Sequence, residues 1–271
     1  MNGEDKVGFI GAGSMGEALV KAVLEAELFN PENILVSDIK KERRQELKSS
    51  YGVETTTNNG ELVSKVDYLI LAIKPKMVNK VLTQVGSLIN EDQILFSIAA
   101  GVSIKQLENN LANEVAVARL MPNTPALIGE GALAYTLGKA AGEEAKKLVE
   151  DLFTPAGIVV QVEEELMDAV TGLSGSGPAY IYVLIEAMAD AGVYEGLARE
   201  KAVKLAAQTV KGAAEMVIKR VEHPAKLKDM VTSPGGTTIT GLKKLEEAGF
   251  RAAIYKAIGA AADKSRQLGG E

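Results

Sequence analysis

Near its start the chain carries the apolar run Val7-Gly8-Phe9-Ile10, followed at once by Gly11-Ala12-Gly13-Ser14-Met15-Gly16 and by helix-patterned residues 17–28. In a strand–turn–helix unit of this kind, the three glycines permit a tight turn, close approach of phosphate to backbone N–H groups, and close helix–strand packing. A phosphate bound there lies at the positive N-terminus of the helix. This segment therefore predicts a site for the pyrophosphate of a dinucleotide.

The spacing of an acidic residue supports this interpretation. A second strand-like run, Ile34-Leu-Val-Ser-Asp38, ends in a carboxylate 22 residues after Gly16, where about 20 are expected. The chain holds 27 glycines, so a chance match is easy and a glycine turn in another α/β domain is the alternative. The strand before, the helix after and the acidic residue together favour the dinucleotide.

Composition narrows the classes of function. The 271 residues allow two modest domains, and 46% hydrophobic with 24% charged residues is ordinary for a soluble globular protein. A net charge of −6, with the basic residues spread along the chain, argues against a nucleic-acid partner. The lack of cysteine excludes thiolate nucleophiles and cysteine metal sites, and the single histidine, His223, removes most histidine mechanisms, so we expect no metal. We find no signal-peptide pattern and no apolar run of about 18 residues, and we expect a cytoplasmic protein without membrane contact.

The order of patterns predicts two domains. Strand-like runs lie near residues 7–10, 34–37, 68–73, 94–99, 115–120, 132–137 and 158–162, with helical patterns between most of them. This alternation predicts a Rossmann-type, doubly wound parallel sheet in a dinucleotide-binding domain over residues 1–163. Helical runs at 165–173, 179–192, 197–220, 238–247 and 249–267 predict an all-helical domain over residues 164–271.

Residues 179–219 carry apolar side chains on more than one helical face. Such a helix must be buried, and a domain of this size covers it more easily with a second subunit. We therefore predict self-association through the helical domain, as a dimer or a higher oligomer. A compact monomeric bundle is the alternative.

Five loop segments follow predicted strands and should meet at the carboxyl edge of the sheet, where open α/β sheets bind ligands. They are the glycine turn, Ser37-Asp38, and residues 72–75, 99–101 and 121–125. The small residues at 99–101 allow a cofactor to lie against the chain, and Asn123 offers both a donor and acceptors. Each segment alone is equally consistent with an ordinary turn.

A second candidate site lies in the helical half at Val231-Thr-Ser233-Pro-Gly235-Gly236-Thr237-Thr238-Ile. Flexible backbone before a helix that Thr237 or Thr238 can cap suggests an anion site of a size that suits a substrate carboxylate. A capped interhelical turn is the alternative. Glycines at 172–177 before Pro178 are better explained as a structural kink, His223 as a helix cap or surface residue, and the acidic run 163–165 by its helix dipole.

Three motifs carry a family resemblance over nearly the whole chain. The most specific is His223-Pro-Ala-Lys-Leu-Lys-Asp-Met-Val-Thr-Ser233-Pro-Gly-Gly-Thr-Thr238-Ile-Thr-Gly-Leu242-Lys-Lys-Leu245-Glu246. The others are Asp168-Ala-Val-Thr-Gly-Leu-Ser-Gly-Ser-Gly-Pro-Ala-Tyr180 and Met121-Pro-Asn-Thr-Pro125. The chain resembles the pyrroline-5-carboxylate reductases, the enzymes of the last step of proline biosynthesis.

The resemblance implies hydride transfer from NAD(P)H to the C=N carbon of 1-pyrroline-5-carboxylate, giving L-proline. It implies a substrate site made of Glu164, Ser233, Gly235, Gly236, Thr237 and Thr238. In it the loop holds the substrate carboxylate, and Thr238 is the catalytic residue, as proton donor or orienting hydroxyl. Hydride transfer to an imine needs neither metal nor thiolate, which agrees with the composition.

For the cofactor, the resemblance and the strand-end segments together assign Gly11, Ala12, Gly13, Ser14, Met15, Gly16, Ser37, Asn59, Ala72, Ile73, Lys74, Pro75, Ala99, Ala100, Gly101 and Asn123. Ser37 would approach the 2′-phosphate of NADP, with Lys40, Lys41, Arg43 and Arg44 adding positive charge. Asp38 opposes this, because a carboxylate aimed at the ribose accepts its hydroxyls and repels a phosphate. We expect NADPH, with NADH as a possible second donor.

Two other functions remain open at this stage. One is a β-hydroxyacid or imine dehydrogenase with the same two-domain plan, although residues 165–180 lack the lysine such enzymes carry there. The other is a catalytically silent NAD(P)-binding regulatory or scaffold protein, which would need no acid-binding loop at 233–238.

Overall fold

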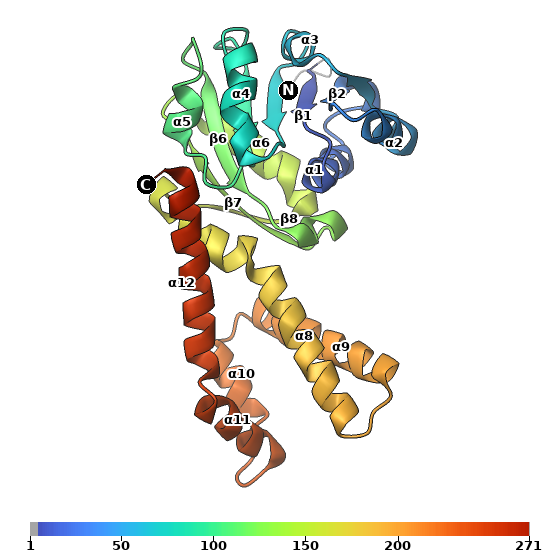
Figure 1. Ribbon diagram of the computed structural model, residues 1–271, viewed down its shortest axis with the longest axis vertical. Helices are drawn as coiled ribbons and strands as arrows, with labels where there is room; N and C mark the ends of the chain where they lie inside the picture. The colour runs from blue at the N-terminus through green and yellow to red at the C-terminus, as the bar shows by residue number, and fades with distance from the viewer. Residues whose placement is uncertain (1–4, 271) are drawn as a thin grey trace. The chain divides into compact units, whose positions relative to one another are not determined.

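The structure, a computed structural model, describes residues 5–270. Its internal contacts divide into two units, one of residues 5–176 with 259–270 and the other of residues 177–258. Figure 1 labels helices and strands of both units where there is room. Each unit is described separately below.

The first unit is built on one eight-stranded sheet with the order β3-β2-β1-β4-β5-β6-β7-β8. Its strands are β1 (Val7–Ile10), β2 (Ile34–Ser37), β3 (Glu54–Thr56), β4 (Tyr68–Leu71), β5 (Ile94–Ser97), β6 (Ala116–Met121), β7 (Gly131–Leu137) and β8 (Gly157–Gln161). Strands β1 to β6 are parallel, as the alternation of patterns predicts.

The direction of β7 departs from the predicted parallel sheet. It pairs antiparallel with β6, and β8 then runs parallel to β7. Residues 122–130 join β6 to β7 and contain only the short 3₁₀ turn Thr124–Ile128. A parallel crossover needs a dozen or more residues, usually with a helix, so this link can only turn the chain back.

Helices cover both faces of the sheet (Figure 1). They are α1 (Ser14–Glu25), α2 (Lys41–Tyr51), α3 (Asn59–Val63), α4 (Pro75–Val85), α5 (Ile104–Glu108) and α6 (Glu143–Phe153). Because side chains alternate along a strand, β1 and β4 send Phe9 and Ile70 to a core with α1, α2 and α6, and Ile10 and Leu71 to a core with α3, α4 and α5. Two buried cores hold the strand ends in fixed positions.

The second unit is entirely helical, as predicted. It comprises α8 (Gly177–Tyr194), α9 (Arg199–Arg220), α10 (Pro224–Met230), α11 (Thr237–Glu247) and the first part of α12 (Phe250–Gly269). Its buried apolar cluster consists of three alanines, Ala189, Ala202 and Ala206. Nowhere in residues 5–270 is a helix long and apolar enough to cross a membrane.

Several local expectations are revised. Strand β3 was not predicted, helix α10 was predicted only by its start at Pro224, and residues 164–175 form a 3₁₀ turn (Glu164–Leu166), α7 (Met167–Val170) and a π-helix (Thr171–Gly175) rather than one helix. Neither Thr237 nor Thr238 caps α11: the cap residue is Gly236, and no side chain bonds to the helix start. The acidic run does not begin a regular helix, and its member Glu164 is paired elsewhere.

The predicted division into residues 1–163 and 164–271 stays a prediction about domains. By contacts alone, residues 164–176 and the last turns of α12 belong with the sheet. His223 does cap α10, as expected, because its Nδ1 accepts from the N–H of Ala225 at 3.2 Å.

Candidate active site

The glycine turn joins β1 to α1 at the carboxyl edge of the sheet. Gly11 has a φ of +107°, and a Cβ there would lie 2.4 Å from the carbonyl oxygen of Ala72. A Cβ on Gly16 would lie 2.4 Å from the carbonyl oxygen of Gly11, so both positions require glycine. Gly13, the residue that precedes α1, faces open space within 4 Å. The turn therefore leaves room for a ligand at the N-terminus of α1.

A pocket of about 300 Å³ opens in front of this turn. Its lining combines two of the predicted cofactor segments with residues that follow β5 and end β6: Gly13, Met15, Gly16, Ala72, Ile73, Lys74, Ile98, Met121 and Pro122. The first backbone N–H groups of α1 have no partner within the helix and point toward this side. Such free N–H groups at a helix start are suited to bind phosphate.

Ser37 and Asn59, both predicted to bind the cofactor, lie side by side. The Ser37 hydroxyl, at the end of β2, donates to Oδ1 of Asn59 at 2.6 Å. Asn59 begins α3, which is capped by Asn58 through bonds from the N–H groups of Gly60 and Glu61. The sequence separation of 22 residues gives no hint of this contact, which only the pairing of β2 with β3 creates.

The Asp38 carboxylate is turned toward backbone. Its Oδ2 accepts from the N–H of Ala12 at 2.8 Å and its Oδ1 accepts from the N–H of Lys40 at 2.8 Å. The nearby arginines also contact the backbone of these loops. Arg43 Nε donates to the carbonyl oxygen of Ala12 at 2.8 Å, and Arg44 Nη1 donates to that of Asp38 at 2.6 Å.

The loop at residues 99–101 is held from two directions within the first unit. Ser103 and Gln106 form a capping box at the start of α5. Gln106 Nε2 also donates to the carbonyl oxygen of Gly269, at the end of α12, at 2.8 Å. Gly101 has a φ of +73°. A Cβ on Gly269 would lie 2.8 Å from the carbonyl oxygen of Gly101, so the two glycines are in close contact. The last turn of α12 therefore supports this loop.

Glu164 is paired with Arg119, a residue that the sequence analysis missed. Its Oε1 accepts from Arg119 Nη1 at 2.8 Å and from the N–H of Ile104 at 3.1 Å. The Arg119 side chain, on β6, is 6% exposed and that of Glu164 is 29% exposed. The Oε2 atom of Glu164 is buried and has no hydrogen-bond partner within residues 5–270. A lone arginine in the apolar strand 116–121 was the signal available in the sequence.

Asn123 is buried, and its amide is occupied by the protein. Nδ2 donates to the carbonyl oxygen of Ser174 at 3.0 Å, and Oδ1 accepts from the N–H of Ala132 at 2.9 Å. The π-helix, closed by a bond from the N–H of Ser176 to the carbonyl oxygen of Thr171, places the Ser174 carbonyl for this contact. The interruption at 172–177 thus has a structural role, as expected.

The predicted substrate loop lies in the second unit, between α10 and α11. Gly235 has a φ of +70°, and the N–H of Gly236 donates to the carbonyl oxygen of Ser233 at 3.1 Å. In the part of the chain that the structure describes, the hydroxyls of Ser233, Thr237 and Thr238 make no hydrogen bond. The loop therefore presents three hydroxyls and the first N–H groups of an eleven-residue helix to a ligand.

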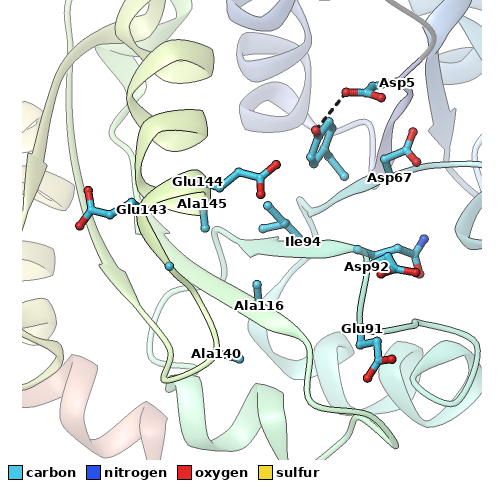
Figure 2. Close-up of a pocket in the computed structure, with 13 residues that line it drawn as sticks. Asp5, Asp67, Glu91, Asp92, Ile94, Ala116, Ala140, Glu143, Glu144 and Ala145 are labelled. Atoms are coloured by element: carbon cyan, nitrogen blue, oxygen red, sulfur yellow. Dashed lines mark hydrogen bonds between the residues drawn. The ribbon is translucent and has the colours of Figure 1, made fainter. Parts of the chain in front are cut away.

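A pocket at the opposite, amino edge of the sheet contains none of the predicted site residues. Figure 2 shows its acidic side chains, with Asp5 accepting from the hydroxyl of Tyr68 at 3.2 Å. Its charged lining residues are all acidic: Asp5, Asp67, Glu91, Asp92, Glu143 and Glu144. Such a surface repels phosphate, so the nucleotide site belongs at the other edge.

Comparison with known proteins agrees with this geometry. Residues 164–268 match the family model described as pyrroline-5-carboxylate reductase dimerisation. Residues 6–101 match the model described as NADP oxidoreductase, coenzyme F420-dependent. The second match covers the glycine turn and its neighbouring strands.

Curated relatives match along the whole chain. A pyrroline-5-carboxylate reductase from Methanosarcina acetivorans is 47% identical over 264 residues, covering 97% of this chain and 98% of the relative. One from Escherichia coli is 40% identical and covers 98% of each chain.

Solved structures give the same result. Plasmodium falciparum pyrroline carboxylate reductase, solved with NADP bound, has a TM-score of 0.89 at 36% identity and covers 98% of this chain and 99% of its own. The reductase from Coxiella burnetii has a TM-score of 0.91 at 32% identity, with 98% of each chain covered. This chain belongs to the pyrroline-5-carboxylate reductase family.

Proposed function

We propose that this protein reduces 1-pyrroline-5-carboxylate to L-proline with NADPH, as the last step of proline biosynthesis. The observation that carries the proposal is the 47% identity to the Methanosarcina acetivorans pyrroline-5-carboxylate reductase, over 97% of the chain. The match covers 98% of the relative as well. A silent scaffold protein would have no use for that loop.

The first unit supplies the nucleotide site in this proposal. When bound, NADPH supplies the hydride. The glycine turn would bind the pyrophosphate through backbone N–H groups, and the segments at 72–75 and 99–101 would border the nicotinamide half. Ser37 and Asn59 would meet the 2′-phosphate. Asn123 would act by holding the end of β6, since its amide is already bonded.

NADPH is the proposed preferred donor. The family model over residues 6–101 is described as an NADP oxidoreductase, and the Plasmodium relative was solved with NADP. The Asp38 carboxylate, which would oppose a 2′-phosphate if aimed at the ribose, bonds to backbone instead. NADH is proposed as a poorer donor.

The second unit supplies the substrate loop in this proposal. The hydroxyls and N–H groups of residues 233–238 would bind the substrate carboxylate. As the C=N carbon gains a hydride, the ring nitrogen must hold or gain a proton, and Thr238 would donate or orient it. Glu164 is a further proposed substrate residue, because its Oε2 atom is buried without a partner among the described residues.

The protein is also proposed to act as a dimer or larger assembly. A family dimerisation model matches residues 164–268. The second unit leaves many apolar side chains on α8 and α9 in contact with water, among them Ile181, Val183 and Leu205. Burying such side chains against a second copy stabilises the assembly by roughly 1.5–3 kcal/mol each.

An assay of nucleotide oxidation tests the proposed reaction. Purified protein is mixed with NADPH and 1-pyrroline-5-carboxylate, the loss of NADPH is followed, and L-proline is identified by mass spectrometry. We expect equal amounts of NADP⁺ and proline, and a lower kcat/KM when NADH replaces NADPH. If neither nucleotide is oxidised, the proposed function is wrong.

The remaining proposals concern location and partners. We propose a cytoplasmic enzyme that does not bind nucleic acid, supported by the net charge of −6 and the scattered basic residues. Cell fractionation followed by immunodetection checks the location, and a shift assay with DNA and RNA checks the second point.

A further inference from the structure

We propose that Asp38 and Arg43 are positioning residues that hold the two peptide groups flanking Ala12 in the glycine turn, and that neither selects between NADPH and NADH. We call Asp38, Arg43 and Glu17 the Ala12 clamp. The inference rests on the proposed function, because it takes the glycine turn as the nucleotide site. It assigns to Asp38 and Arg43 a role different from the one that sequence spacing predicts.

Asp38 binds the backbone N–H of Ala12. The carboxylate bridges two backbone donors, the N–H of Ala12 and that of Lys40, each at 2.8 Å. It thereby joins the glycine turn to the start of α2. Hydrogen bonds from backbone to a carboxylate are charge-assisted and about twice as strong as neutral ones. With one backbone bond on each oxygen, the orientation of the carboxylate is fixed by the protein itself.

Arg43 binds the other side of the same residue. Its Nε donates to the Ala12 carbonyl oxygen at 2.8 Å, while Nη2 donates to Glu17 at 2.7 Å and Nη1 to Glu46 at 2.5 Å. The hydrogen bond to Glu17 raises the pKa of the Arg43 guanidinium. The guanidinium is thus directed at the turn and at two carboxylates, which is an arrangement unsuited to a 2′-phosphate.

Glu17 holds Arg43 in place from α1. Its carboxylate accepts from Arg43 and, at 3.1 Å, from the hydroxyl of Tyr51 at the end of α2. The Arg43 and Glu17 side chains are 24% and 25% exposed, so water screens the pair only partly. Two helices, α1 and α2, therefore fix the guanidinium that contacts Ala12.

The clamp determines where the turn can bind phosphate. Ala12 is fully buried, and both of its backbone polar groups are occupied by side chains. Phosphate must then bind to the N–H groups that follow Ala12, where Gly13 leaves open space. Among residues 5–270, Lys40 and Lys41 are exposed and form no ion pair, which leaves them, with Ser37, to recognise the 2′-phosphate.

The proposal is tested by measuring the dissociation constants of NADP⁺ and NAD⁺, by calorimetry, for the full-length variants Asp38→Asn, Arg43→Met and Glu17→Gln. Asparagine keeps one acceptor and so loses one of the two backbone bonds. Asp67→Asn is the matched control, because the Asp67 carboxylate also accepts from a backbone N–H, that of Lys6 at 2.7 Å, but at the amino edge of the sheet.

We expect Asp38→Asn and Arg43→Met each to weaken the binding of both NADP⁺ and NAD⁺ by about tenfold, because each removes a charge-assisted hydrogen bond. The ratio of the two constants should stay within about twofold of the wild-type ratio. Glu17→Gln should weaken both by about threefold, although it contacts no nucleotide, and Asp67→Asn should change neither.

Three results would overturn the proposal. An increase of about tenfold in NADP⁺ preference for Asp38→Asn would identify Asp38 as a ribose ligand. A weakening of NADP⁺ binding alone for Arg43→Met would identify Arg43 as a phosphate ligand. Unchanged binding in all three variants would remove the positioning role. Thermal unfolding checks that each variant folds. If Asp38→Asn and Arg43→Met fail to fold, Glu17→Gln still tests the proposal. A wild-type protein that binds neither nucleotide would instead refute the proposed function, and the clamp's role with it.

Discussion

Strands β1, β4 and β5 of the first unit carry apolar side chains on both faces, and helices of the same unit bury nearly all of them. Helices α8 and α9 of the second unit are also rich in apolar residues, yet its buried cluster holds only three alanines. Val183 is 64% exposed and Leu205 is 58% exposed. The first unit buries its own apolar side chains, whereas the second unit leaves large apolar side chains of α8 and α9 exposed.

This difference separates two tasks. A nucleotide site made of backbone N–H groups needs a turn fixed to a fraction of an ångström, and we propose that the closed core and the Ala12 clamp supply it. We expect the helical unit to gain stability when a second copy covers α8 and α9. Its substrate loop should therefore be competent in the assembly, while the nucleotide site should not depend on it.

The largest expected effect comes from placing a charge on the exposed apolar surface of the second unit. Leu205→Asp should weaken self-association by about a thousandfold, because it removes an apolar contact and buries a carboxylate. Leu88→Asp is the matched control in the first unit, where Leu88 is 51% exposed. Analytical ultracentrifugation should give a smaller species for the first variant only. Equal masses for the two variants would show that α9 does not lie at an interface.

Next in size is the loss of the Thr238 hydroxyl. Thr238→Ala should lower kcat for the imine by about a hundredfold, the usual contribution of a positioned proton donor, with NADP⁺ binding unchanged. Thr240→Ala, two residues further along α11, removes a hydroxyl that bonds to the Gly236 carbonyl oxygen at 3.0 Å and should retain activity. Turnover rates and calorimetry measure the two effects. Near-normal turnover of Thr238→Ala at every pH would reject its role.

A smaller effect is expected from the ion pair of the first unit. Arg119→Met should lower the free energy of unfolding by about 2 kcal/mol, because it leaves the partly buried Glu164 carboxylate without its cation. Arg251→Met breaks an exposed pair with Glu246 in the second unit and should leave stability unchanged. Denaturant unfolding measures both. Equal losses of unfolding free energy in the two variants would mean that the Arg119–Glu164 pair stabilises the protein no more than the exposed pair does.

The smallest effect concerns Tyr135, whose hydroxyl donates to Glu150 at 2.9 Å in the core of the first unit. Burial, and then this hydrogen bond, raise the pKa of Tyr135 to about 12. The unfolded chain loses this proton near pH 10, so the stability contributed by Tyr135 is complete below about pH 10 and falls as the pH rises toward about 12. The stability advantage of wild type over Tyr135→Phe should therefore shrink over that interval in urea unfolding. A constant difference would show that the hydroxyl is not held in its neutral form.

Sequence patterns reveal what depends on local burial. The central strands were predictable because Tyr68-Leu-Ile-Leu71 is apolar on both faces, which only a covered parallel strand requires. β3 was missed because it has three residues. The start of α10 at Pro224 was predicted, but its extent was not, because seven residues with little apolar periodicity resemble a loop. The antiparallel direction of β7 follows from a short link, and a strand has the same pattern in either direction.

The parts of the candidate site that consist of local backbone loops were predictable from the sequence. The glycine turn and the loop at 233–238 depend on residues that are adjacent in the chain, so their motifs are visible. The contacts of Asp38 with Ala12, and of Arg119 with Glu164, join residues 26 and 45 positions apart. No spacing rule anticipates them, because the order of strands in the sheet creates both.

The division between the two units is tested most directly by titrating NADP⁺ into Leu205→Asp at a concentration where ultracentrifugation finds the dissociated form. A nucleotide site built on the first unit's own core should keep its NADP⁺ dissociation constant within about threefold of the wild-type value. A loss of binding of about thirtyfold or more, in a variant whose first unit remains folded, would contradict that independence.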